Sequence, residues 1–429
     1  MTSAAPTTVD SIDLSDMAFW AQPPDEREKA FALLRAERPV AFFEEPDFAG
    51  SSSLALARGP GYFALTRHAD ISEVSRHPEI FCSGKGALSI IDLPDTMVEY
   101  FAGMISSDNP RHARLRRIVS KAFSPHQVRA IAEEIGRVAD GLIDRAADLG
   151  ECDFVTSFAG PLSLEIICDM MGLPPSEHAT VFRCSNVITS SDDPEFLPPG
   201  SDHLLAMLEA GQELTALMTE LAAFRLEHPT DDLTTALVTT NIDGEALTQS
   251  ELASFFILLL TAGNETTRNS LAHGLLAFSQ HPDQRAIWQA DPVGVAATGV
   301  DEIVRWASPV NWMRRTVTTD TVLHGQALTE GDKVLLFYGS ANRDERVFAD
   351  PYTFDVLRSP NPHLGFGSAG PHFCLGAHLA RQEIGVMLRL LLTRLPDIEV
   401  SGEPDWAVSR FVSGIKHLPC RFTPVRPHA

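Results

Sequence analysis

The stretch "HLGFGSAGPHFCLGAHLAR", residues 363–381, places one cysteine between a glycine-rich loop and an amphipathic segment. The glycines before Cys374 allow a close backbone approach or a positive φ. Apolar residues recur after Cys374 at helical spacing: they are Leu379, Ala380, Ile384, Met387, Leu388 and Leu391. Cys374 therefore lies at a predicted helix N-terminus, where free N–H groups favour a thiolate.

Such a thiolate is suited to act as a nucleophile or as a metal ligand. A nucleophile needs a nearby general base, and the only local candidate is His372, two positions away. Taken alone, the stretch is also compatible with a buried structural cysteine.

The composition indicates a soluble globular protein. The chain has 429 residues, 44% of them hydrophobic, which is enough for a large core in one or two domains. Its net charge of −23 argues against binding to nucleic acid or to an anionic membrane surface. The N-terminus does not resemble a secretory signal, and the longest apolar run, residues 252–263, is too short for a membrane anchor. We expect a cytoplasmic location.

Hydrophobic periodicity predicts a mainly α fold with small antiparallel β-sheets. The expected helices are residues 25–38, 109–122, 126–147, 201–226, 249–280, 295–307 and 375–394, and the expected strands lie in 61–66, 321–339 and the last thirty residues. No repeat or linker divides the chain, so we expect a single domain, 1–429, with a flexible N-terminus over residues 1–20.

The helix predicted over residues 249–280 is the longest. Thr248 and Glu251 form a capping box at its start, and Pro282 marks its end. Its first half is apolar on every side, which predicts a path through the core. The motif "AGNETT", residues 262–267, then places polar groups at buried positions. This interruption predicts a π-type bulge or a satisfied core hydrogen-bond network.

From end to end, the chain resembles the cytochrome P450 family of haem-thiolate monooxygenases. In that family Cys374 would be the axial ligand of the iron of haem b, with the N–H groups of Leu375 and Gly376 directed at the sulfur and Phe366 shielding it. Phe366 lies eight residues before the cysteine, one more than the usual family spacing, so the loop is longer by one residue.

The resemblance also implies a set of cationic residues for the haem propionates. They are His112 and Arg116 in "SSDNPRHARLRRIVSKAF", Arg315 in "NWMRRTVTTD" and His372. Arginine suits a carboxylate because its fork can bind both oxygens. Without the resemblance, the residues around His112 would be interpreted as a solvated basic helix face.

Two further motifs acquire roles through the resemblance. Ala262 and Gly263 would face the haem and leave a groove for dioxygen, while Glu265 and Thr266 would be the catalytic pair that delivers protons. Many relatives have Asp where this chain has Glu265. Glu302, Arg305 and Arg358 match the family's structural Glu-x-x-Arg network, although a surface Glu–Arg pair is the simpler interpretation of the first two alone.

The expected substrate pocket is apolar. Its candidate residues are Ile90, Ile91, Met97, Phe101, Leu259, Val310, Trp312, Phe411 and Val412. The runs "DDLTTALV", "SFFILLL", "AGNETTRN", "EEP", "ANRDE" and "HLGFG" resemble bacterial members that hydroxylate the terminal methyl of methyl-branched lipids, isoprenoids or sterol side chains. Oxidation of another hydrophobic secondary metabolite or xenobiotic is the alternative. A non-catalytic haem sensor or carrier is the alternative of a different class.

The resemblance implies O2 as co-substrate and a separate ferredoxin with its ferredoxin reductase, because the chain carries no flavin, nicotinamide or iron–sulfur motif. A basic patch would bind the acidic partner. Its candidate residues are Arg111, Arg114, Arg117, Lys121 and Arg381.

Overall fold

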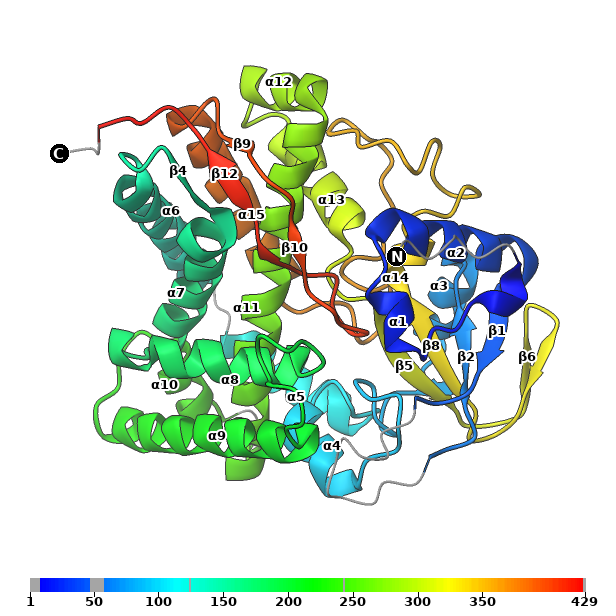
Figure 1. Ribbon diagram of the computed structural model, residues 1–429. Helices are drawn as coiled ribbons and strands as arrows, with labels where there is room; N and C mark the ends of the chain where they lie inside the picture. The colour runs from blue at the N-terminus through cyan, green and yellow to red at the C-terminus, as the bar shows by residue number, and fades with distance from the viewer. Residues whose placement is uncertain (1–7, 47–57, 123–124, 242–243, 427–429) are drawn as a thin grey trace.

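The protein is described by a computed structural model that covers residues 8–46, 58–122, 125–241 and 244–426, and most of it is helical (Figure 1). The predicted helices are all present within two residues of their expected ends. They are α2 (Pro24–Glu37), α5 (Arg111–Ala122), α6 (Pro125–Ala146), α9 (His203–Glu227), α11 (Gln249–Gln280), α13 (Ala296–Ala307) and α15 (Ala377–Arg394).

Further helices were not predicted from the sequence. They are α1 (Met17–Trp20), α3 (His68–Arg76), α4 (Asp95–Ala102), α7 (Gly160–Met171), α8 (His178–Ser190), α10 (Leu233–Thr239), α12 (Pro282–Ala290) and α14 (Tyr338–Ala341). Among them α7 is buried on most sides. Its apolar residues therefore do not form the single stripe by which an amphipathic helix is recognised.

The strands form small sheets at the edge of the helical body. The largest has the order β1-β2-β8-β5-β3, with bounds β1 (Val40–Phe43), β2 (Tyr62–Leu65), β3 (Phe81–Cys82), β5 (Trp312–Val317) and β8 (Lys333–Phe337). Four further strands pair as β6 (Thr321–Leu323) with β7 (Gln326–Leu328) and β10 (Asp405–Trp406) with β11 (Ile415–His417), and β12 (Pro419–Arg421) lies between β4 (Glu151–Asp153) and β9 (Glu399–Val400). All pairings are antiparallel as predicted, except that β2 and β8 are parallel.

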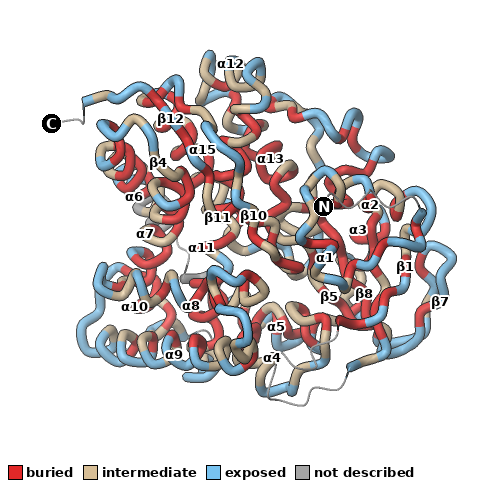
Figure 2. Tube along the Cα trace, in the orientation of Figure 1, coloured by how far each residue is buried: buried red, intermediate tan, exposed pale blue. Residues whose placement is uncertain are grey.

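The long helix α11 crosses the middle of the molecule (Figure 1). Its predicted capping box is present: Thr248 Oγ1 accepts from the Glu251 N–H at 3.2 Å, and the Thr248 N–H donates to Glu251 Oε2 at 3.0 Å. One half packs into a core with α7, α8 and α9, and the other half packs into a core with α6, α13 and α15. Figure 2 shows buried residues along almost all of its length.

Two expectations about local structure are wrong. The helix α11 is continuous α-helix through residues 262–267, without a π-bulge. Thr266 instead donates its hydroxyl to the Ala262 carbonyl at 2.8 Å, four residues earlier, within the regular helix. The only π-helical turn in the described residues is Val155–Ala159.

The expected flexible terminus is also wrong for residues 8–20, whereas residues 1–7 lie outside the described part of the structure. Leu14 and Trp20 are buried, and the Trp20 indole N–H donates to the Leu14 carbonyl at 2.9 Å. The packing of Trp20 against Phe31 and Phe337 fixes this segment to α2 and β8. Within the described residues, no helix has the length and apolar character needed to cross a membrane.

Candidate functional site

Cys374 ends a compact loop directly before α15. Its backbone N–H donates to the Phe366 carbonyl at 3.0 Å, which closes the loop despite the additional residue. Gly370 is required within it, because a Cβ there would lie 2.2 Å from the Ser75 carbonyl oxygen. The predicted shielding ring of Phe366 is held in turn by Arg381, whose guanidinium lies 4.4 Å from the ring centroid.

Cys374 is surrounded by protein, but it has an exposed surface and lines a cavity of about 240 Å³. Burial has the largest effect and raises the pKa of the thiol. Hydrogen bonds from the backbone N–H groups of Gly376 and Ala377 lower this pKa, and so do the charges of Arg116 and Arg381. Gly376 was predicted as a donor, and Ala377 is an additional one. A metal cation bound to the sulfur would stabilise the thiolate and so offset the effect of burial on the thiol pKa.

The predicted cationic residues meet at one side of the same cavity. His112, Arg116, Arg315 and His372 all line it, and the rings of His112 and His372 are 4.1 Å apart. Burial, together with the charge of Arg315 and the presence of His112 and Arg116, lowers the pKa of His372 to about 2. The His372 ring is therefore neutral, and the guanidinium groups carry the positive charge of the cluster.

These residues fit a haem. Neither Arg116 nor Arg315 forms an ion pair with an acidic residue in the described part of the chain, although Arg315 is buried. Arg116 donates to the Phe373 carbonyl at 2.7 Å and Arg315 to the Arg314 carbonyl at 2.7 Å. Two cations without counter-charges at a cavity wall suit the two propionates. A Cβ on Gly376 would meet no protein atom within 4 Å, so the wall beside the sulfur is open.

The wall formed by α11 includes Ala262, Gly263 and Thr266, as predicted, and its other residues are Phe255, Leu258, Leu259, Thr267 and Ser270. Gly263 also has a packing role that was not predicted, because a Cβ there would lie 3.2 Å from the Ile167 side chain of α7. Thr266 lines both this cavity and a second one beyond it, so this residue lies where the two spaces meet.

Glu265 lies beside Thr266 on α11 and is buried in a polar network. Its Oε1 forms an ion pair with Arg268 and accepts from Asn269 Nδ2 at 3.1 Å, while its Oε2 accepts from Thr189 Oγ1 at 3.4 Å. Arg268 also donates to Asn186 Oδ1 at 3.0 Å. Asn186 and Thr189 belong to α8, so the network joins α8 to α11. Arg268 was not predicted as part of the site, although its position three residues after Glu265 places both side chains on one face of the helix.

Glu383 is a second buried carboxyl at the Cys374 cavity, and it was not predicted. It lies on α15, lines the cavity and hydrogen-bonds the Thr267 hydroxyl. Burial raises its pKa to about 8, so the side chain is mostly protonated at neutral pH. In the sequence it lies next to the apolar stripe of α15, where a single Glu resembles an ordinary surface residue.

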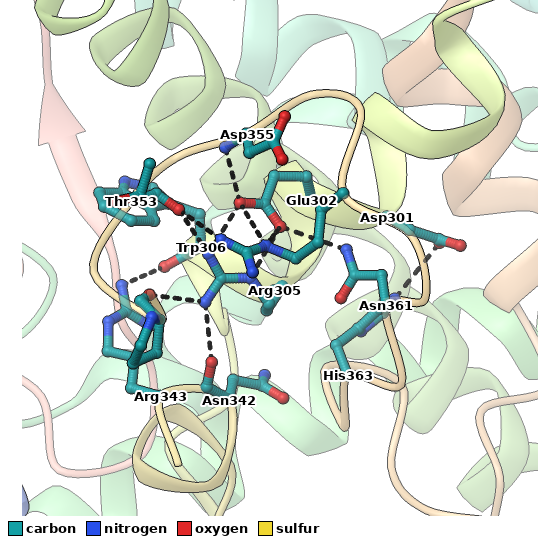
Figure 3. Close-up of polar contacts among 12 residues, drawn as sticks. Asp301, Glu302, Arg305, Trp306, Asn342, Arg343, Thr353, Asp355, Asn361 and His363 are labelled. Atoms are coloured by element: carbon teal, nitrogen blue, oxygen red, sulfur yellow. Dashed lines mark hydrogen bonds and ion pairs between the residues drawn. The ribbon is translucent and has the colours of Figure 1, made fainter. Parts of the chain in front are cut away.

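Glu302, Arg305 and Arg358 form the predicted network, most of which Figure 3 shows. Arg305 donates to both carboxylate oxygens of Glu302 at 2.7 Å, and Arg358 Nε lies 3.1 Å from Glu302 Oε2. Asn361 Nδ2 also donates to Glu302 at 3.2 Å. Since Asn361 lies two residues before His363, this network anchors the segment that leads into the cysteine loop.

The second cavity has a volume of about 290 Å³ and shares six lining residues with the first: Ile105, Leu258, Ala262, Thr266, Val310 and Met313. Every predicted pocket residue lines one of the two spaces. Leu259 lines the Cys374 cavity, and the other residues line the second cavity: Ile90, Ile91, Met97, Phe101, Val310, Trp312, Phe411 and Val412. The side chains from α8 and α9, such as Ile188 and Met207, were not predicted.

The predicted basic patch is largely neutralised. Four of its arginines pair with acidic side chains, and the Lys121 side chain lies outside the described part of the structure. The pairs are Arg111 with Glu99, Arg114 with Glu251, Arg117 with Glu245 and Arg381 with Asp301. A basic docking surface built on these four residues is therefore a wrong expectation.

Comparisons with known proteins agree with this geometry. The cytochrome P450 family model matches residues 296–403. The chain is 47% identical over 412 residues, 95% of this chain and 94% of the relative, to the methyl-branched lipid omega-hydroxylase of Mycobacterium tuberculosis. It is 38% identical over 396 residues, 91% of this chain and 90% of the relative, to the steroid C26-monooxygenase of Mycolicibacterium smegmatis.

A solved structure is similar over almost the whole chain. It is a Mycobacterium marinum cytochrome P450 in complex with pseudoionone, with a TM-score of 0.90 and 41% identity, covering 98% of this chain and 100% of that chain. Similarity of this extent in sequence and in structure covers both cavities as well as the cysteine loop. The chain therefore belongs to the cytochrome P450 family, is a monooxygenase and has haem b as its cofactor.

Proposed function

We propose that the protein hydroxylates the terminal methyl group of a methyl-branched lipid, an isoprenoid or a sterol side chain, using O2 and two electrons from a ferredoxin and its reductase. The observation that carries the proposal is the apolar second cavity that meets the Cys374 cavity at Thr266. The relatives support the substrate class, since one hydroxylates methyl-branched lipids, one acts on steroids at C26, and the solved one binds pseudoionone.

In this proposal Cys374 holds the haem iron, while Arg116, Arg315, His112 and His372 hold the propionates. The bound haem supplies the oxidising chemistry that inserts one oxygen atom into a C–H bond. Thr266 and Glu265 move protons toward the space above the sulfur. The buried position of Glu265 supports a catalytic protein over a haem sensor or carrier, which has no use for a proton-relaying carboxyl group there.

The apolar residues of the second cavity would orient the substrate. A terminal methyl is harder to oxidise than the carbon next to it, so selectivity requires that the end of the chain is held rigidly in the constriction beside Thr266. Ile105, Val310 and Met313 line both cavities and would form this constriction. Replacing Val310 with Ala would widen it and move part of the oxidation to the neighbouring carbon.

We place the reaction in the cytoplasm, with the ferredoxin as electron donor. The test is product analysis with the reconstituted holoenzyme, a ferredoxin and its reductase, comparing a methyl-branched fatty acid with its linear isomer. The proposal predicts substrate-dependent O2 consumption and a terminal alcohol from the branched acid. Oxidation only at internal carbons would contradict the assigned position, and O2 consumption that no lipid stimulates would favour the sensor.

A further inference from the structure

A third cavity lies between the N-terminal helices and the second half of α11. Its volume is about 780 Å³, and it shares no lining residue with the two cavities around Thr266. Its walls come from α1, α2, α11, the end of α13, α14 and β10. Figure 1 shows α1 and α2 next to α14, on the side of the molecule that carries the largest sheet. The third cavity is therefore separate from the site proposed for substrate hydroxylation.

Arg27 of α2 lines this cavity without a counter-charge. The residue is only 8% exposed, and among the described residues neither its Nε nor the Oε2 of the adjacent Glu28 has a hydrogen-bond partner. Within the described residues no acidic side chain lies at ion-pair distance from it. Burial lowers its pKa, and the charge of Glu28 raises the pKa in the opposite direction. A buried charge that lacks a partner is costly, so the site favours an anion from outside the chain.

The neighbouring charges do not neutralise Arg27. Glu28 Oε1 lies 3.4 Å from Arg343 Nε, so the one carboxylate beside Arg27 is shared with a second guanidinium. His273 donates from Nε2 to the Ser413 carbonyl at 3.2 Å, and burial lowers its pKa to about 4, which keeps the ring neutral. Lys29, also on the wall, pairs with Glu26 at 2.7 Å and lies 3.6 Å from Asp25. At this end of the cavity the two guanidinium groups of Arg27 and Arg343 therefore share one carboxylate, that of Glu28.

The remaining wall is strongly aromatic. It includes Trp20, Phe31, Trp306, Phe337, Tyr352 and Trp406. The Arg27 guanidinium lies 5.9 Å from the centroid of the Trp20 ring, and the Arg343 guanidinium lies 5.0 Å from that of Trp306. Aromatic faces favour a flat ring, and a guanidinium fork favours a carboxylate.

We propose that this cavity is a second ligand site that binds an aromatic carboxylate, with the carboxylate on Arg27 and the ring among the tryptophans. The site is independent of the hydroxylation proposed at Thr266. Its ligand would contact α11 at His273, two helical turns after Thr266, and would not enter the space above Cys374.

Binding is tested on the holoenzyme with 2-naphthoate as the probe and its neutral analogue 2-naphthalenemethanol as the matched control. Three of the five tryptophans line the cavity, so quenching of tryptophan fluorescence reports binding. We expect naphthoate to bind at least about tenfold more tightly than the alcohol, and Arg27→Gln to remove this preference while Arg27→Lys keeps part of it. Equal binding of the two probes, or naphthoate binding that Arg27→Gln leaves unchanged, would overturn the proposal.

A second probe and a second spectroscopic measurement define the class of ligand and the location of its site. Decanoate carries the same carboxylate on an aliphatic chain, and binding as tight as that of naphthoate would overturn the aromatic assignment. The haem absorption spectrum is recorded in the same titration and should not change. A spectral change that follows the quenching would place naphthoate above Cys374 and contradict the third cavity as its site.

Thermal unfolding separates a binding role from a structural role of Arg27. Because Arg27 is unpaired, Arg27→Met should raise the unfolding midpoint of the ligand-free protein, whereas naphthoate should raise the midpoint of the wild type only. A variant that unfolds at a lower temperature and is stabilised by naphthoate as much as the wild type would show that Arg27 is structural.

Discussion

Glu265 and Arg268 form an ion pair one turn apart on α11, and the two side chains are only 2% and 3% exposed. The pair holds a carboxylate beside Thr266 while Arg268 reaches Asn186 on α8. A charged carboxylate is thus kept next to the proposed reaction space without direct access to bulk water. Movement of α8 would change the contacts that hold it.

Replacing Glu265 with Gln should slow turnover by about 10²-fold, because the amide keeps the shape of the side chain but cannot carry a proton. Product formed per O2 consumed, normalised to haem content, measures the effect. Thr189→Val is the matched control: it removes the 3.4 Å contact to Glu265 and the bond to the Ser185 carbonyl at 2.8 Å, but it leaves the Glu265 carboxylate in place and should retain most of the turnover. Normal turnover and coupling in Glu265→Gln would exclude a proton-delivering role.

Replacing Glu302 with Gln should cost about 3–5 kcal/mol of unfolding free energy, because it leaves Arg305 buried without its counter-charge. Glu134→Gln is the control: Glu134 and Arg137 have the same spacing, but Arg137 is exposed and Glu134 partly exposed, so the loss of this ion pair should cost about 0.2–1 kcal/mol. Urea unfolding of both variants measures the difference. Equal losses of unfolding free energy in the two variants would mean that the buried Glu302–Arg305 network is no more stabilising than an ion pair at the surface.

Replacing Arg315 with Leu should weaken haem retention by about tenfold or more, because a charge-assisted hydrogen bond to a propionate contributes about 1.5–3 kcal/mol. Arg314→Leu is the neighbouring control. Arg314 is buried too, but it pairs with Asp92 at 2.8 Å and donates to the Ser89 carbonyl at 3.2 Å. We expect Arg314→Leu to lower the stability of the fold and Arg315→Leu to accelerate haem loss. The reverse pattern would exclude Arg315 from the propionate site.

The buried carboxyl of Glu383 should make stability depend on pH. Its pKa rises from 4.5 to about 8 on folding, so the folded protein binds a proton that the unfolded chain has lost across this interval. The stabilisation is complete below about 4.5 and declines as the pH rises towards about 8, by up to about 1.4 kcal/mol per pH unit. Glu383→Gln is neutral throughout, and its unfolding midpoint should vary less over this range. Parallel profiles for the two proteins would contradict the raised pKa.

The sequence predicted the parts of the fold that local signals determine. The capping box of Thr248 and Glu251 places the start of α11 at the correct residue, because side-chain capping depends on neighbours three positions apart. The helix α7 was missed, because burial on most sides removes its periodicity. The parallel pairing of β2 with β8 joins segments separated by about 270 residues and has no local signal.

The candidate site follows the same division. Local sequence motifs identified Cys374, Thr266 and Glu302. In the structure Cys374 and Thr266 line the same cavity, and Glu302 forms the expected pair with Arg305. Glu383 was missed because its burial depends on the packing of α15 against α11. The pairing of Arg111 and Arg117 with acidic residues depends on contacts made by distant segments, so charge counting along the sequence overestimated the basic patch.

The central claim is that the Cys374 sulfur binds the haem iron. The direct measurement is the absorption spectrum of the reduced, carbon monoxide-bound protein, recorded for the wild type and for Cys374→Ser expressed with ample haem precursor. We predict the red-shifted band of a thiolate-ligated haem in the wild type and its loss, together with turnover, in the variant. A wild-type protein without this band, or a Cys374→Ser protein that keeps both the band and the turnover, would contradict the account.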